Sequence, residues 1–104
     1  MPLIDVAPVA ELPPGSMKLV EAGLVSVGVY NCDGSFHAIE DRCSHDDGPL
    51  CEGTWDRETC RVVCPRHGAT FDLRTGRAVT LPAYKPVGTF AVVVEDGVVK
   101  VDVP

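Results

Sequence analysis

Four side chains that commonly bind transition metals stand in two short motifs. Cys43 and His45 are separated by one residue, and Cys64 and His67 are separated by two. The segment around the first pair, DRCSHDDGPL, is polar and turn-forming, so it predicts a loop. Core packing does not explain pairs as tight as these, whereas a centre with two thiolate and two imidazole ligands does. We therefore expect these four residues to bind one metal centre.

The distribution of the ligand types indicates which metal is bound. Zinc fingers usually group like ligands, with cysteines in one motif and histidines in the other. Here each motif supplies one cysteine and one histidine. In a centre of two irons bridged by sulfides, one iron takes both thiolates and the other takes both imidazoles, which two mixed motifs can deliver. The alternation favours a [2Fe-2S] cluster, and a structural zinc ion is the alternative.

The two motifs resemble those of the Rieske [2Fe-2S] family, in which Cys-x-His and Cys-x-x-His loops flank the cluster. The similarity includes the motifs themselves, the glycine that follows the second one, and a β-rich pattern over nearly the whole chain: Cys43-Ser44-His45, Cys64-Pro65-Arg66-His67 and Gly68. The resemblance implies that the two cysteines bind the inner iron and the two histidines the outer iron. It also implies that electron-transfer partners dock near His45 and His67.

The residues that follow His67 bear on the reduction potential. High-potential members of the family have a serine two residues after the second ligand histidine and a tyrosine four residues after it. This chain has Ala69 and Phe71 at those positions. Hydrogen bonds to the sulfurs stabilise the reduced cluster, so their loss predicts a potential near the low end of the Rieske range, roughly -150 mV. The disulfide that clamps the loops in those members would need cysteines where this chain has Gly48 and Arg66.

Three further cysteines lie outside the motifs, at positions 32, 51 and 60. An odd total of five, together with an N-terminal sequence that does not resemble a secretion signal, indicates metal binding rather than a disulfide framework. We expect Cys32, Cys51 and Cys60 to be small buried or half-buried thiols, with a Cys51–Cys60 disulfide as the alternative. The same features predict a cytoplasmic location.

Short strands must position the two motifs. Turn sequences such as Asp33-Gly34 and Asp96-Gly97 recur between short apolar segments, a pattern typical of an all-β sandwich or barrel. We expect one antiparallel domain over 1–104, with a small cluster-binding subdomain formed by loops at about 41–50 and 64–70. The expected strands are an edge strand at 3–6, a strand at 17–21, and hairpins formed by 24–30 with 35–40, by 53–55 with 59–63, and by 90–94 with 99–103.

Composition narrows the range of partners. The chain has 104 residues, 45% of them hydrophobic, and no apolar run long enough to span a bilayer. Nine basic and fifteen acidic side chains give a net charge of -6, which argues against nucleic acid and anionic membranes and favours a basic protein partner. We also expect the protein to be a monomer.

Several other residues have two interpretations. His37 is expected to be a structural histidine rather than a third ligand, and Trp55 is expected to pack under a hairpin. The acids Asp46 and Asp47 follow a ligand histidine and either belong to a solvated loop or orient a basic partner. Residues 81–86 form either an ordinary connection or the proline-containing loop that covers the cluster in the Rieske family.

Three functions are consistent with the sequence. By resemblance, the first is a soluble one-electron carrier, a Rieske-type ferredoxin that links an NAD(P)H-dependent flavin reductase to a terminal oxygenase of the aromatic-ring type and catalyses nothing itself. The second is a Rieske-like small subunit of assimilatory nitrite reductase, in which the ligands are often lost. The third is a zinc-stabilised interaction domain, which would be colourless.

Overall fold

The computed structural model describes residues 3–23, 25–42, 49–65, 68–81 and 85–103. These residues form ten strands and one short 3-10 helix, η1 (Val9–Glu11). The predicted all-β fold is confirmed. The strands are, in chain order, β1 (Leu3–Pro8), β2 (Met17–Ala22), β3 (Val25–Cys32), β4 (Ser35–Glu40), β5 (Trp55–Asp56), β6 (Arg61–Val63), β7 (Thr70–Asp72), β8 (Thr89–Phe90), β9 (Val92–Glu95) and β10 (Val98–Asp102).

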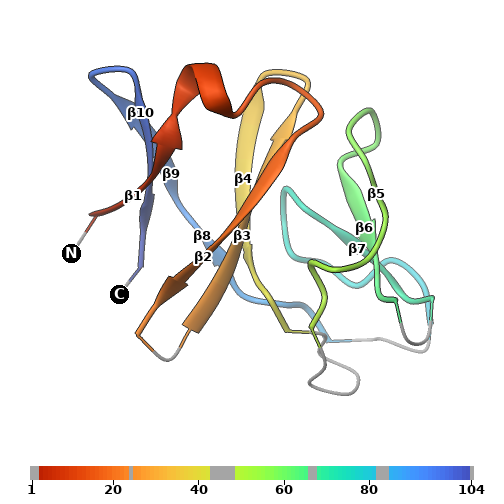
Figure 1. Ribbon diagram of the computed structural model, residues 1–104. Helices are drawn as coiled ribbons and strands as arrows, with labels where there is room; N and C mark the ends of the chain where they lie inside the picture. Colours follow the sequence, from red (N-terminus) through yellow and green to blue (C-terminus); the bar gives the residue numbers. More distant parts are fainter. Residues whose placement is uncertain (1–2, 24, 43–48, 66–67, 82–84, 104) are drawn as a thin grey trace.

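The strands pair into three antiparallel sheets. The first sheet has the order β1-β10-β9, the second β2-β3-β4-β8, and the third β5-β6-β7. The second sheet stands in the middle of the molecule, with the first sheet on one side and the third on the other (Figure 1). In the described part of the chain, no helix is long and apolar enough to cross a bilayer.

Strand β3 is buried on both faces because a hydrophobic core lies on each side of it. Val27 and Val29 are fully buried in the core shared with β1 and β10, where they pack with Val99 and Val101. Alternation along the strand turns Tyr30 to the opposite face, into the core shared with β6 and β7. The third sheet is therefore fixed to the rest of the protein by apolar packing against the central sheet.

Most expected strands are present, with differences that follow from pairing. The hairpin of β3 and β4 turns at Asp33-Gly34 as expected, and the terminal strand β1 pairs with β10. The expected strand at 90–94 is divided, because Phe90 pairs with β4 in the central sheet while β9 pairs with β10. Strand β7 was not expected from the sequence, although its backbone completes the third sheet.

Candidate metal centre

The third sheet and its connections carry the two motifs. The first loop leaves β4 at Glu40 and returns through Leu50 toward β5, and the second loop joins β6 to β7. Of the four expected ligands, only Cys64 belongs to the described residues. Cys43, His45 and His67 lie outside them, and so do the acids at 46 and 47 and the positions of Gly48 and Arg66. Within the described ranges, no cluster of three or more metal-binding side chains is formed.

Cys64 is held at the start of the second loop by backbone hydrogen bonds. Its N–H donates to the Ala69 carbonyl at 2.7 Å, and its carbonyl accepts from the Gly68 N–H at 3.0 Å. Gly68 has a φ of +74°, a left-handed conformation that glycine adopts without strain. The Cys64 side chain is a free thiol with 1% exposure. The second loop is thus closed by its own main chain around a buried thiol.

Asp41 stands at the start of the first loop and contacts its end. The backbone N–H of Asp41 donates to the Ser26 carbonyl on β3 at 2.8 Å. Its carboxylate oxygen Oδ1 accepts two hydrogen bonds, from the N–H of Leu50 at 2.8 Å and the N–H of Cys51 at 2.7 Å. The segment that leaves β4 and the segment that enters β5 are therefore joined through one side chain.

The end of the first loop also lies against the start of the second. The Gly53 N–H donates to the Leu50 carbonyl at 3.1 Å, and the Val63 N–H donates to the Thr54 carbonyl at 2.9 Å. A Cβ atom on Gly53 would overlap the carbonyl oxygen of Val63, the residue just before Cys64. The close approach of these two backbones requires glycine at position 53 and brings the described ends of both loops together.

Cys51 is half-buried beside the first loop. A Cβ atom on Gly28 would overlap the Cys51 sulfur, so the thiol lies directly over this glycine of β3. Burial raises the pKa of the Cys51 thiol to about 12; the Tyr30 hydroxyl acts in the opposite direction, and the Asp41 carboxylate adds to the rise. Burial, followed by the Cys51 thiol, raises the pKa of Tyr30. Both groups are therefore neutral at physiological pH.

The surroundings of Cys64 fit a redox cluster bound through thiolate. Ala69 and Phe71 are fully buried and pack in the same apolar core as Cys64, together with Leu50 and Val62. A low-dielectric environment favours a cluster whose formal charge in the oxidised state is zero. The two positions where the high-potential relatives carry hydroxyls are thus apolar and shielded from water, and the expectation of a low potential stays a prediction.

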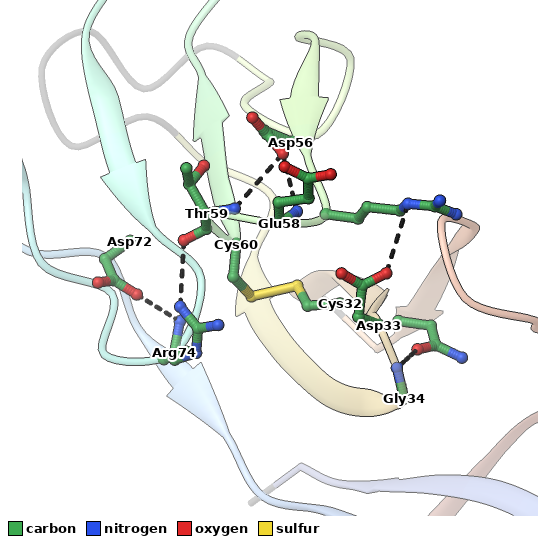
Figure 2. Close-up of a disulfide and its surroundings, with 11 residues drawn as sticks. Cys32, Asp33, Gly34, Asp56, Glu58, Thr59, Cys60, Asp72 and Arg74 are labelled. Carbon is green, nitrogen blue, oxygen red and sulfur yellow. Dashed lines mark hydrogen bonds and ion pairs between the residues drawn. A yellow bond between two sulfur atoms is a disulfide. The ribbon is translucent and has the colours of Figure 1, made fainter.

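The structure corrects the expectation for two of the remaining cysteines. Cys32, at the end of β3, and Cys60, just before β6, form a disulfide with a Cα–Cα distance of 5.5 Å, within the usual range (Figure 2). The expectation that both are free thiols is wrong, and so is the alternative pairing of Cys60 with Cys51, which is a free thiol. Linear spacing could not reveal this pair because the contact joins two different sheets.

The disulfide lies among other contacts between the central and third sheets. Arg57 and Asp33 form an exposed ion pair at 3.4 Å, which connects the β5–β6 turn to the β3–β4 turn (Figure 2). The Arg74 guanidinium donates to the Thr59 carbonyl at 3.1 Å. Exposed pairs contribute little to stability, so the covalent link is the strongest single constraint at this end of the molecule.

Other residues singled out from the sequence have clear positions. Trp55 packs edge-to-face on Tyr30 with ring centroids 4.8 Å apart, as expected for a packing residue. His37 is half-buried on β4, where burial, and then Arg74, lower its pKa while Asp72 acts in the opposite direction. Of residues 81–86, the described ones are exposed, and Leu81 is 80% exposed. Whether this segment covers the cluster stays a prediction.

Comparison with known proteins identifies the family. The family model of the Rieske [2Fe-2S] domain matches residues 3–91. The 3-phenylpropionate/cinnamic acid dioxygenase ferredoxin subunit of Escherichia coli (strain K12) is 40% identical over 101 residues, which cover 97% of this chain and 93% of that protein. The corresponding subunit of Photorhabdus laumondii subsp. laumondii is 42% identical over 97 residues, covering 93% and 90% of the two chains.

Solved structures agree with this assignment. The ferredoxin of carbazole 1,9a-dioxygenase from Nocardioides aromaticivorans IC177 superposes with a TM-score of 0.89 at 32% identity, covering 97% of each chain. The Sphingomonas yanoikuyae B1 ferredoxin superposes with a TM-score of 0.86 at 31% identity, covering 99% of this chain and 100% of that one. With the motifs, the fold and these similarities in agreement, the chain belongs to the Rieske [2Fe-2S] domain family.

Proposed function

We propose that this protein is a Rieske-type ferredoxin, which carries single electrons from an NAD(P)H-dependent flavin reductase to a terminal oxygenase of the aromatic-ring type. The observation that carries the proposal is the similarity to dioxygenase ferredoxin subunits over 97% of this chain. The chain spans 93% of the length of that subunit but matches only 30% of the terminal oxygenase of carbazole 1,9a-dioxygenase. The similarity thus spans nearly the whole of a carrier subunit and less than a third of an oxygenase chain.

The ligands in this proposal are Cys43, His45, Cys64 and His67. The buried free thiol of Cys64 at the start of a tightly closed loop supports its assignment. When bound, the cluster stores one electron, since its formal charge changes from zero to -1 on reduction. By resemblance, the two cysteines would bind the inner iron and the two histidines the outer iron, and the buried position of Cys64 agrees with the first of these roles.

The partners are proposed on similar grounds. A chain in the complex of reduced oxygenase and oxidised ferredoxin of carbazole 1,9a-dioxygenase superposes with a TM-score of 0.88 at 34% identity, which supports an oxygenase as acceptor. We place the docking face around His45 and His67, because an imidazole edge bound to iron gives a short path for the electron. The flavin reductase, the cytoplasmic location and the monomeric state stay predictions. The comparisons favour this function over the nitrite reductase subunit and the zinc domain.

Two experiments test the proposed function. A potentiometric titration of the purified protein should follow a one-electron Nernst curve, with one electron taken up per chain; uptake of none or of two would overturn the proposal. In addition, a tagged copy of the protein, expressed in its native host and purified at low salt, should copurify with a flavoprotein reductase and a terminal iron oxygenase. Recovery of a large sirohaem protein instead would favour the nitrite reductase subunit.

A further inference from the structure

The side chain of Asp41 joins the two ends of the segment that carries Cys43 and His45. One carboxylate oxygen accepts hydrogen bonds from two consecutive backbone amides, Leu50 at 2.8 Å and Cys51 at 2.7 Å. Hydrogen bonds to an ionised acceptor are stronger than neutral ones, and these two act on adjacent residues, so they fix both the distance and the orientation of the loop end.

Both ends of this segment are also attached to the same central strand. The Asp41 N–H is bonded to the Ser26 carbonyl of β3 at 2.8 Å. The Cys51 thiol lies over Gly28 of that strand, where a Cβ would overlap it. The Asp41 carboxylate therefore closes a short connection between two points on β3.

The second loop is closed in a different way. Its ends meet through two backbone hydrogen bonds between Cys64 and the residues at 68 and 69, so the closure does not depend on a side chain. The first loop is longer, and in the described part of the chain its closure runs from the Asp41 carboxylate to the amides of Leu50 and Cys51. A change of side chain at position 41 should therefore disturb the first loop selectively.

We propose that Asp41 is a positioning residue for the cluster, whose carboxylate fixes the base of the first loop and thereby the placement of Cys43 and His45. The inference rests on the proposed function, since it assumes that these two residues are ligands. Asp41 itself is not a ligand in this proposal. It acts through the amides of Leu50 and Cys51, and its effect should appear in how firmly the cluster is held.

Two substitutions separate the geometry of the acceptor from its charge. Asp41→Asn removes the charge but keeps an oxygen that can accept the same hydrogen bonds, whereas Asp41→Ala removes both. A long-range effect of the charge on the cluster would be lost equally in the two variants. An effect through the loop base would be large in the alanine variant and mostly restored in the asparagine variant.

The chain offers a matched control in Asp56. Its Oδ1 also accepts from two backbone amides, Glu58 at 2.8 Å and Thr59 at 3.4 Å, but in the β5–β6 turn. Asp56→Ala therefore removes the same charge and two similar hydrogen bonds at the other end of the third sheet. Figure 2 shows these two hydrogen bonds. The Asp56 hydrogen bonds are exposed whereas those of Asp41 are part-buried, so the melting temperature of each variant is measured beside its iron release. If Asp41→Ala acts only by general destabilisation, its iron release should be no faster than its fall in melting temperature accounts for, on the scale set by Asp56→Ala.

The experiment follows iron release from the cluster-loaded proteins to a ferrous chelator after reduction, together with the EPR spectrum of each reduced variant. We expect Asp41→Ala to release iron at least about tenfold faster than the wild type and to show a broadened signal. Asp41→Asn should stay within about threefold of the wild type, and so should Asp56→Ala. Failure of Asp41→Ala to take up a cluster, with the other two variants loaded, would equally support the proposal.

Other outcomes overturn it. If Asp41→Ala and Asp41→Asn release iron at the same rate, or if Asp41→Ala and Asp56→Ala do, the hydrogen bonds at the base of the first loop do not determine how firmly the cluster is held. If the wild type holds two irons and two sulfides but Asp41→Ala releases them at the wild-type rate, this inference fails and the proposed function stands. If the wild type itself holds no iron-sulfur cluster, the proposed function fails.

Discussion

Replacing Cys32 and Cys60 together by alanine should destabilise the protein strongly. The disulfide closes a loop with a sequence separation of 28 residues. The loop-closure entropy that such a link removes from the unfolded chain corresponds to about 3.6 kcal/mol at 25 °C. Both cysteines are at most 4% exposed, so alanine avoids burying a new polar group. At about 4 °C or more per kcal/mol for a domain of this size, the melting temperature should fall by about 14 °C or more.

The assay compares thermal unfolding of the cluster-loaded wild type and double variant by circular dichroism. Cys51→Ala is the control, because Cys51 is half-buried and free; it should lower the melting temperature far less. Alkylation of the denatured wild type without reductant, followed by mass spectrometry, gives the direct check. We expect Cys32 and Cys60 to resist alkylation until a dithiol is added, and prompt labelling of both would refute the disulfide and the stability argument built on it.

Three further predictions concern the surroundings of the cluster. The double substitution Ala69→Ser and Phe71→Tyr should raise the potential measured by voltammetry, by about 59 mV for each 1.4 kcal/mol by which new hydrogen bonds favour the reduced state; an unchanged potential in a loaded protein would contradict this. Gly53→Ala should lower the fraction of protein that retains its cluster, because its Cβ would overlap the Val63 carbonyl, whereas full occupancy by iron analysis would show that the backbones can separate. Cys51 should react with iodoacetamide much more slowly than an unfolded thiol near pH 9, because its pKa is raised to about 12; rapid labelling of the folded protein would argue against burial. The raised pKa of Cys51 also makes the free energy of unfolding depend on pH, because the thiol loses its proton at lower pH in the unfolded chain than in the folded protein. The stability that the neutral Cys51 thiol contributes is complete below pH 9 and is lost as the pH rises toward 12.

The strands and turns were largely predictable because their signals are local. The alternation of Val99 and Val101 and the Asp33-Gly34 turn each depend on a few neighbouring residues. Strand β7 was missed because its three residues are too short to show alternation and it exists through pairing with β6. Phe90 was assigned to the wrong sheet because sequence does not show that β4 has a free edge there.

The candidate site was predictable where its residue types are characteristic of metal binding. Two mixed Cys and His motifs indicated the ligands, and the family comparison confirms the kind of cluster. The disulfide could not be predicted because it joins the end of β3 in the central sheet to the turn before β6, and the free Cys51 could not be distinguished from Cys60 by spacing. Asp41 was missed because a carboxylate just before a ligand loop looks like any solvated acid until its hydrogen bonds to Leu50 and Cys51 are known.

Pulsed EPR of the reduced protein tests the ligand assignment most directly. We expect two irons and two sulfides per chain and a signal coupled strongly to two imidazole nitrogens, those of His45 and His67. Replacing either of these histidines by cysteine should remove one nitrogen coupling, whereas His37→Gln should leave both. A signal with no nitrogen coupling, or one in which the coupling disappears with His37, would contradict the assignment of Cys43, His45, Cys64 and His67 as the ligands.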